Sequence, residues 1–69
     1  MASSTYAVTK IVGTSKTSIE DAIEGAIATA SKSLRGLDWF EVISTRGYID
    51  NDKVKYYQVT LELGFKYDG

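Results

Sequence analysis

The sequence predicts an α+β fold in which a three-stranded antiparallel sheet partly wraps one helix, in the chain order strand, helix, strand, strand. Three observations lead to this prediction. Apolar residues recur at helical spacing over 19–34, and the stretch 54–67 alternates between apolar and polar residues. Residues 50–52, Asp-Asn-Asp, supply turn chemistry between two extended runs. A long hairpin formed by 37–48 and 54–67, together with a first strand, would cover the helix.

The chain is predicted to be a single small domain, residues 1–69, whose first five residues are frayed. A chain of this length buries only about 60% of its unfolded surface, so its own core gives little stability. Cys and His are both absent, which excludes disulfides and thiolate or imidazole metal sites. Self-association is the remaining source of stability. With neither a secretion signal nor an apolar run of membrane-spanning length, we expect a cytoplasmic homo-oligomer without a membrane partner.

The charge pattern argues against two further classes of function. Eight basic and nine acidic residues are interspersed and give a net charge of -1, whereas a nucleic-acid binder carries a basic patch. The absence of His and Cys removes the commonest general base and the strongest thiol nucleophile. The sequence therefore favours a binding protein over an enzyme, and predicts no nucleic-acid partner.

The first strand is predicted over 6–12, where β-branched and aromatic residues are concentrated. The two faces of this strand are similar in polarity. One face consists of residues 7, 9 and 11, and the other of residues 6, 8, 10 and 12. The sequence therefore does not assign the buried face. Residues 13–15, Gly-Thr-Ser, are expected to end this strand.

The helix has the clearest pattern in the chain. Thr17 is predicted as its N-cap, with Glu20 three positions later completing a capping box. Lys32 and Arg35 favour the negative end of the helix dipole, and Gly36 is placed to adopt the left-handed closing conformation. The apolar stripe that should face the core comprises Ile19, Ala22, Ile23, Ala26, Ile27, Ala30 and Leu34.

Trp39, the only tryptophan, opens the second predicted strand. Because side chains alternate along a strand, Trp39 and Phe40 point to opposite faces. We expect Phe40 and Val42 to pack on the helix, which leaves Trp39 and Glu41 on the far face. An indole there is either an anchor in a subunit interface or a stacking surface for a ligand. The residues alone leave both readings open.

Polar candidates accompany the indole. In the last strand the odd positions 57–65 are apolar, so Gln58 falls on the opposite, polar face. Its amide offers two donors and an acceptor, which can match a heterocycle edge, or it is simply solvated. Arg46 and Lys66 could neutralise a phosphate. Trp39 has an odd number and Arg46 an even one, so in a regular strand their side chains point to opposite faces. The two side chains can share one face only through a bulge between them or a contribution from two subunits.

Short motifs along the chain match one family in order and approximate spacing. They are Val12-Gly13-Thr14-Ser15, Glu20-Asp21-Ala22-Ile23, Leu37-Asp38-Trp39-Phe40-Glu41-Val42, Arg46-Gly47, Tyr57-Gln58-Val59 and Gly64-Phe65. On these motifs the chain from about Tyr6 to Lys66 resembles the dodecins, small flavin-binding proteins. The resemblance implies the β-α-β-β fold and a hollow dodecamer that holds flavins between its subunits.

The resemblance also implies roles for the candidate residues. Trp39 would stack on the isoalloxazine ring, with two copies sandwiching two flavins across a two-fold axis. Gln58 would hydrogen-bond the pyrimidine end of the ring, and Arg46 would lie near the ribityl-phosphate end. Lys66 stands where relatives often carry Arg, and Lys cannot contact a phosphate through two parallel hydrogen bonds as Arg can. Both flavin mononucleotide (FMN) and riboflavin, which lacks the phosphate, therefore stay open as ligands. Some relatives also bind coenzyme A, for which Arg35 is the matching contact.

The expected function is thus flavin storage and sequestration, with quenching of flavin photochemistry and no catalytic turnover. A ligand-free structural homo-oligomer is the main alternative, and a flavin-dependent enzyme is a third class.

Overall fold

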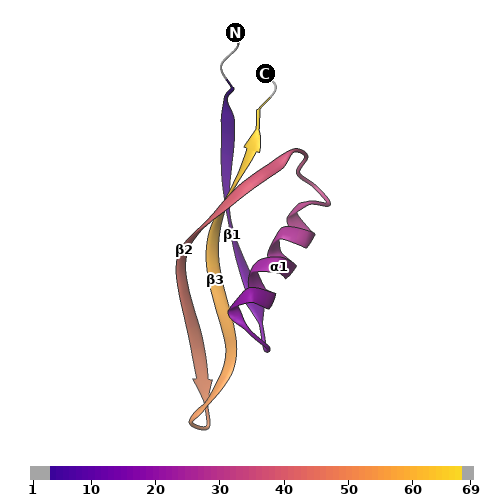
Figure 1. Cartoon of the computed structure of the whole chain (residues 1–69). Coiled ribbons are helices and arrows are strands. Elements are labelled where there is room, and N and C mark those ends of the chain that lie inside the picture. The colour runs from indigo at the N-terminus through magenta and orange to yellow at the C-terminus, as the bar shows by residue number, and fades with distance from the viewer. Residues whose placement is uncertain (1–3, 68–69) are drawn as a thin grey trace.

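The computed structural model describes residues 4–67, and these form one helix and three strands (Figure 1). The elements are β1 (Tyr6–Ser15), α1 (Ile19–Ala30), β2 (Leu37–Asp50) and β3 (Lys53–Lys66). The predicted order of strand, helix, strand, strand is confirmed. Of the residues expected to be frayed at the start, 1–3 lie outside the described residues.

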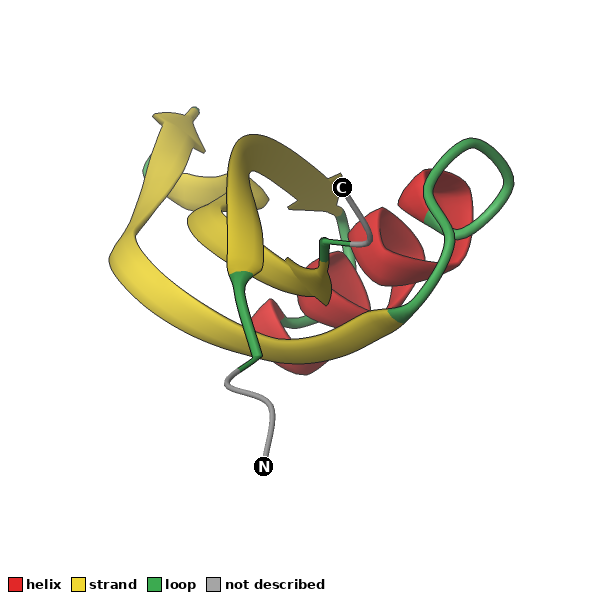
Figure 2. Ribbon diagram, turned by 90° about the horizontal axis from the view of Figure 1, so that it is seen from above, coloured by secondary structure: helices red, strands yellow, loops and turns green. Residues whose placement is uncertain are grey.

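The sheet is antiparallel, in the order β1-β3-β2, so β3 is central and β1 and β2 are its edges. It curves, and α1 runs along one side of it (Figure 2). α1 packs against β1 and β3, while the hairpin of β2 and β3 continues beyond the helix (Figure 1). The result is an elongated subunit, with principal extents of 57 × 20 × 14 Å. Within the described residues, no helix has the length and hydropathy needed to cross a bilayer.

The core is small and lies between α1 and one face of β3. Its buried members are Ala22 from the helix and Val59, Leu61 and Leu63 from the strand. The alternation predicted for the last strand is therefore confirmed. Partly buried side chains pack around this centre: Ile11, Ile19, Ile23, Ala26, Ile27, Ala30 and Leu37.

The predicted end of the first strand is wrong, because β1 continues to Ser15. Gly13 does not break the strand; it allows α1 to approach it. A Cβ at this position would collide with the Ala22 carbonyl oxygen and come within 2.9 Å of the Ala26 Cβ. The structure also identifies the buried face of β1, which is the one that carries Ile11, Gly13 and Ser15.

The predicted capping box is also wrong by one residue. Ser18, not Thr17, is the N-cap, and its side chain accepts a hydrogen bond from the Asp21 backbone N–H at 3.0 Å. Thr17 is unavailable because it belongs to the turn that follows the longer β1. Its backbone N–H donates to the Ser15 hydroxyl at 2.9 Å.

At its other end the helix is shorter than predicted, since it ends at Ala30 with Ser31 as C-cap. The Ser31 hydroxyl donates to the Ala28 carbonyl, and Leu34 lies in the turn that follows. Gly36 does adopt a positive φ, of 73°, but it leads into β2 instead of closing the helix. Its carbonyl accepts a hydrogen bond from the Lys66 backbone N–H.

The predicted turn between the long strands is confirmed. Asn51 and Asp52 have φ values of 53° and 63°, the left-handed pair that a two-residue turn of type I′ requires. Asn and Asp are the residues that best tolerate this conformation after Gly. The turn therefore fixes the register of the hairpin.

Ser15 stabilises the junction between β1 and α1, and replacing it tests this role. Its buried hydroxyl accepts from the backbone N–H groups of Thr17 and Ser18 and donates to the Asp21 carboxylate at 2.6 Å. In Ser15→Ala these partners lose that oxygen, so the free energy of unfolding should fall by about 1–3 kcal/mol. Urea denaturation measures the change. The exposed Ser33→Ala is the matched control, and equal midpoints for the two variants would contradict the assignment.

Candidate functional site

The sheet has a second face, turned away from α1, and the candidate residues lie on it. Residues directly opposite each other in an antiparallel pair share a face, so the register assigns every member. We call it the outer face. It comprises Tyr6, Val8, Lys10, Val12 and Thr14 of β1, Trp39, Glu41, Ser44, Arg46 and Tyr48 of β2, and Tyr56, Gln58, Thr60, Glu62, Gly64 and Lys66 of β3.

The bulge between Val42 and Ser44 in β2 brings Trp39 and Arg46 to the same face. The register shifts between Leu37 and Trp39, and again between Val42 and Ser44. An extra residue in one strand reverses the facing of all residues beyond it. Trp39 consequently lies opposite Gly64, and Arg46 lies opposite Gln58. The bulge that a shared face requires is therefore present within a single subunit.

The candidates nevertheless form two separate groups along the sheet. Trp39 lies opposite Gly64, with Lys66 two residues further along β3, whereas Arg46 lies opposite Gln58. The two β3 positions are six residues apart, about 20 Å at roughly 3.3 Å per residue. The indole and the amide of one subunit therefore lie at separate places along the outer face.

The Trp39 indole lies flat against β3 at Gly64. A Cβ built on Gly64 would coincide with the ring, and its three nearest atoms are Cε2, Cζ2 and Nε1 of Trp39. Gly64 is buried by this contact, while Trp39 stays 41% exposed. One face of the indole thus rests on the strand, and the other is open.

Next to the indole, the bulge residue Asp38 interacts with Tyr6 from the opposite edge of the sheet. A hydrogen bond to the Asp38 carboxylate, followed by the negative charge of that group, raises the pKa of the Tyr6 phenol above its ordinary value of 10.0. This contact links β1 to the residue that immediately precedes Trp39.

The expectation that Phe40 and Val42 pack on the helix is wrong. Both point to the helix side of β2, but they remain 47% and 41% exposed. The physical reason is the strand order: α1 packs over β1 and β3, so β2 extends past its cover. Other large apolar side chains are also exposed, namely Tyr6, Val8, Val12, Ile43, Tyr48, Ile49, Val54 and Tyr67.

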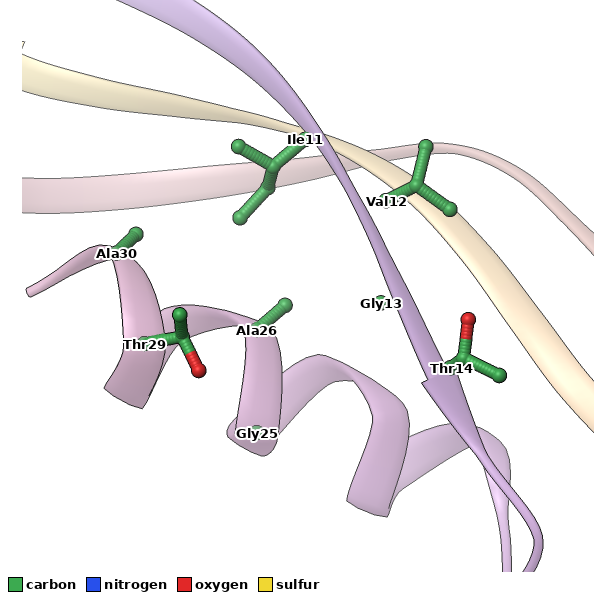
Figure 3. A pocket seen from close by; sticks show the side chains of 8 residues that line it. All are labelled: Ile11, Val12, Gly13, Thr14, Gly25, Ala26, Thr29 and Ala30. Carbon is green, nitrogen blue, oxygen red and sulfur yellow. The ribbon is translucent and has the colours of Figure 1, made fainter.

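The hollows of the described chain do not enclose a ring-sized ligand beside the indole. The hollow that Trp39 lines, together with Ile27 and Leu63, has a volume of about 140 Å³. Binding pockets for drug-sized ligands are typically about 300–1,000 Å³. A larger hollow of about 380 Å³ lies between β1 and α1, where Figure 3 shows Ile11, Ala26 and Ala30 around it. None of the four candidate side chains lines that hollow.

Arg35 and Lys66 lie on a third hollow, of about 500 Å³, at the end of the sheet near Gly36. Leu34 and Phe65 provide its apolar wall. Two cations beside apolar surface could hold a phosphate-bearing ligand. Coenzyme A binding at Arg35 stays a prediction.

Tyr6 and Asp38 were not predicted from the sequence, and Gly64 was predicted only as one of three glycines that could mark a close approach to the backbone. Gly64 did carry a signal, because it is the one outer-face position of β3 without a side chain. Its pairing with the tryptophan became visible only once the bulge had set the register. For the contact of Tyr6 with Asp38 the sequence contains no comparable signal, since the two residues belong to opposite edges of the sheet.

The fold and the outer face define a small β-α-β-β protein that presents one aromatic ring, open on one side, on the sheet surface away from its helix. The family model for dodecin matches residues 5–68. The chain belongs to the dodecin family. Membership makes it a small flavin-binding protein.

Individual relatives agree with this assignment. The dodecin of Thermus thermophilus is 52% identical over 61 residues, which cover 88% of this chain and 88% of that protein. The solved structure of dodecin from Streptomyces coelicolor has a TM-score of 0.93 at 45% identity, covering 100% of this chain and 99% of that one. Dodecin from Streptomyces davaonensis gives a TM-score of 0.92 at 43% identity, with 99% and 100% covered.

Proposed function

We propose that this protein stores and sequesters flavin by stacking the isoalloxazine ring on Trp39. The observation that carries the proposal is the half-exposed indole, which has one face on the Gly64 backbone and the other open. Stacking of a base on an aromatic side chain contributes about 1–3 kcal/mol, and a tricyclic ring offers more contact area than a base. An electron-rich indole against the excited flavin also quenches its photochemistry.

In this proposal Gln58, Arg46 and Lys66 supply polar recognition. The Gln58 amide pairs with the pyrimidine end of the ring, where N–H and C=O groups alternate. Arg46, opposite Gln58 in the register, neutralises the phosphate of FMN. Lys66, on the same strand as Gly64, offers a second positive charge near the indole. FMN is the proposed ligand, and riboflavin would lack the contacts to phosphate.

The binding site is proposed to lie between subunits. Because the two positions lie about 20 Å apart along β3, we place the indole and the amide around one ring from different copies of the chain. The many exposed apolar side chains give those copies a surface to pack on. A hollow cytoplasmic dodecamer, the assembly implied for this family, would bring such pairs together.

Two stacked flavins between two indoles would have their reactive faces covered, which suits storage and not turnover. The alternative is a structural homo-oligomer in which Trp39 is only an interface anchor. The exposed apolar surface is consistent with that alternative too. Absorbance of the purified protein and identification of extracted small molecules distinguish the two, since a flavin store should be yellow.

The first prediction concerns Trp39. Addition of apo-protein to FMN should quench flavin fluorescence strongly, and Trp39→Ala should abolish most of that quenching because the stacking partner is gone. A fluorescence titration measures both affinity and residual emission. Tyr67→Ala removes an aromatic ring that is 58% exposed at the end of the described chain, and it should titrate like the wild type. Full quenching by Trp39→Ala would refute the proposal.

The second prediction separates the amide from the indole. Gln58→Ala should weaken FMN binding by about twofold to tenfold, as expected for the loss of hydrogen bonds worth about 0.5–1.5 kcal/mol. Emission at saturation should stay as low as in the wild type, because the ring still stacks on Trp39. Thr60→Val, on the same strand and face, is the control. An unchanged affinity would remove Gln58 from the site.

The third prediction concerns the assembly. Light scattering should give a particle near twelve times the chain mass of 7.6 kDa. Because the site is shared, urea that dissociates the particle should release FMN over the same concentration range. The two transitions are followed by scattering and by recovery of flavin emission. Full quenching by dissociated subunits would contradict a site formed between copies.

A further inference from the structure

We propose that Gly64 is the positioning residue for the Trp39 indole, and that its missing side chain sets the plane in which the ring meets a ligand. This inference rests on the proposed function and adds a residue to it. Gly64 touches no ligand in this proposal. It acts through the tryptophan.

The position of Gly64 is unusual for a glycine. It lies in the interior of the central strand, where glycine costs roughly 0.5–1 kcal/mol relative to alanine. The other outer-face positions of β3 all carry side chains, namely Tyr56, Gln58, Thr60, Glu62 and Lys66. Glycine also has an ordinary strand conformation here, since the positive φ values of the described chain belong to Gly36, Asn51 and Asp52. No backbone requirement therefore explains Gly64.

The indole does explain it. The three atoms nearest to a Cβ at Gly64 all belong to Trp39, and they come from both rings of the indole. A side chain at position 64 would occupy the space of the ring. Any residue other than glycine therefore forces the indole to lift off the strand or to rotate about its χ angles. An aromatic side chain that covers a strand glycine also compensates for the packing that glycine lacks.

The consequence for binding is a fixed ring plane. Because the indole lies directly over the Gly64 backbone, that backbone limits how far the ring can tilt toward β3. A flavin can then stack between this face and the one that a second copy presents. If the ring were tilted, its edge would enter that space and parallel overlap would be lost. Gly64 thus pre-organises the stacking surface before the ligand arrives.

Two substitutions from glycine to alanine test this inference. Gly64→Ala should weaken FMN binding by about tenfold or more, since most of a stacking contact worth about 1–3 kcal/mol is lost. In the apo-protein, the emission of Trp39 should shift to the red and its quenching by acrylamide should increase. Trp39 is the only tryptophan, so both signals report on this ring alone.

Gly25→Ala is the matched control. A Cβ at Gly25 has no neighbour within 4 Å, so this variant should bind FMN and emit like the wild type. If Gly64→Ala also keeps wild-type affinity and wild-type emission, the inference is overturned while flavin storage still stands. If the wild type itself fails to bind flavin, the proposed function fails first.

A double variant shows whether Gly64 acts through the indole. In a Trp39→Ala background, the additional change Gly64→Ala should cause no further loss of FMN affinity. A further loss of tenfold would mean that Gly64 acts independently, against the inference. If Gly64→Ala alone does not fold, the double variant should recover soluble protein, because the obstructing ring is absent. Failure of both to fold would equally overturn the assignment.

Discussion

The two-residue period of β3 is the constraint on which both faces of the sheet depend. Val59, Leu61 and Leu63 point toward α1 and form most of the small core. The residues between them, together with Gln58 and Gly64, form the outer face. A slip of one residue would expose the core and bury the polar residues, so the hydrophobic effect that fixes the register also fixes the position of the candidate residues. The core and the candidate site are thus determined by the same alternation.

The side chains of β2 match the faces of β3 only because β2 contains bulges. With unbroken alternation along β2, Trp39 and Arg46 would lie on opposite faces, and the bulge between Val42 and Ser44 removes that conflict. The bulge at Asp38 likewise places Trp39 opposite Gly64. Bulges locally disrupt the hydrogen-bond ladder, so they persist where the gain elsewhere is larger. Here the gain is that the indole and the guanidinium share a surface free of the helix.

The sequence predicts those features of the fold that depend on residues close together in the chain, and it does not predict those that depend on contacts between distant residues. The helix stripe, the β3 alternation and the Asn51–Asp52 turn are local patterns, and each was predicted. The length of β1 and the cap at Ser18 were not, because they depend on Gly13 meeting the helix and on Ser15 reaching Asp21. For the site, the sequence indicated that Trp39 and Arg46 could share a face only through a bulge or through two subunits, and it did not distinguish between them. It offered Gly64 only as an isolated glycine.

The single subunit leaves two surfaces of β2 uncovered. Its helix covers β1 and β3 but leaves β2 uncovered, so Phe40, Val42 and Ile43 remain exposed. Its indole has one covered face and one open face. Both surfaces lie on or beside the same strand, and burial of either requires another molecule. Because Phe40 and Val42 point to the helix side of β2 and Trp39 points to the outer face, the two surfaces need two separate contacts with other molecules. A subunit with both faces of β2 open can therefore pack on one copy through its helix side and meet a ligand on its outer face.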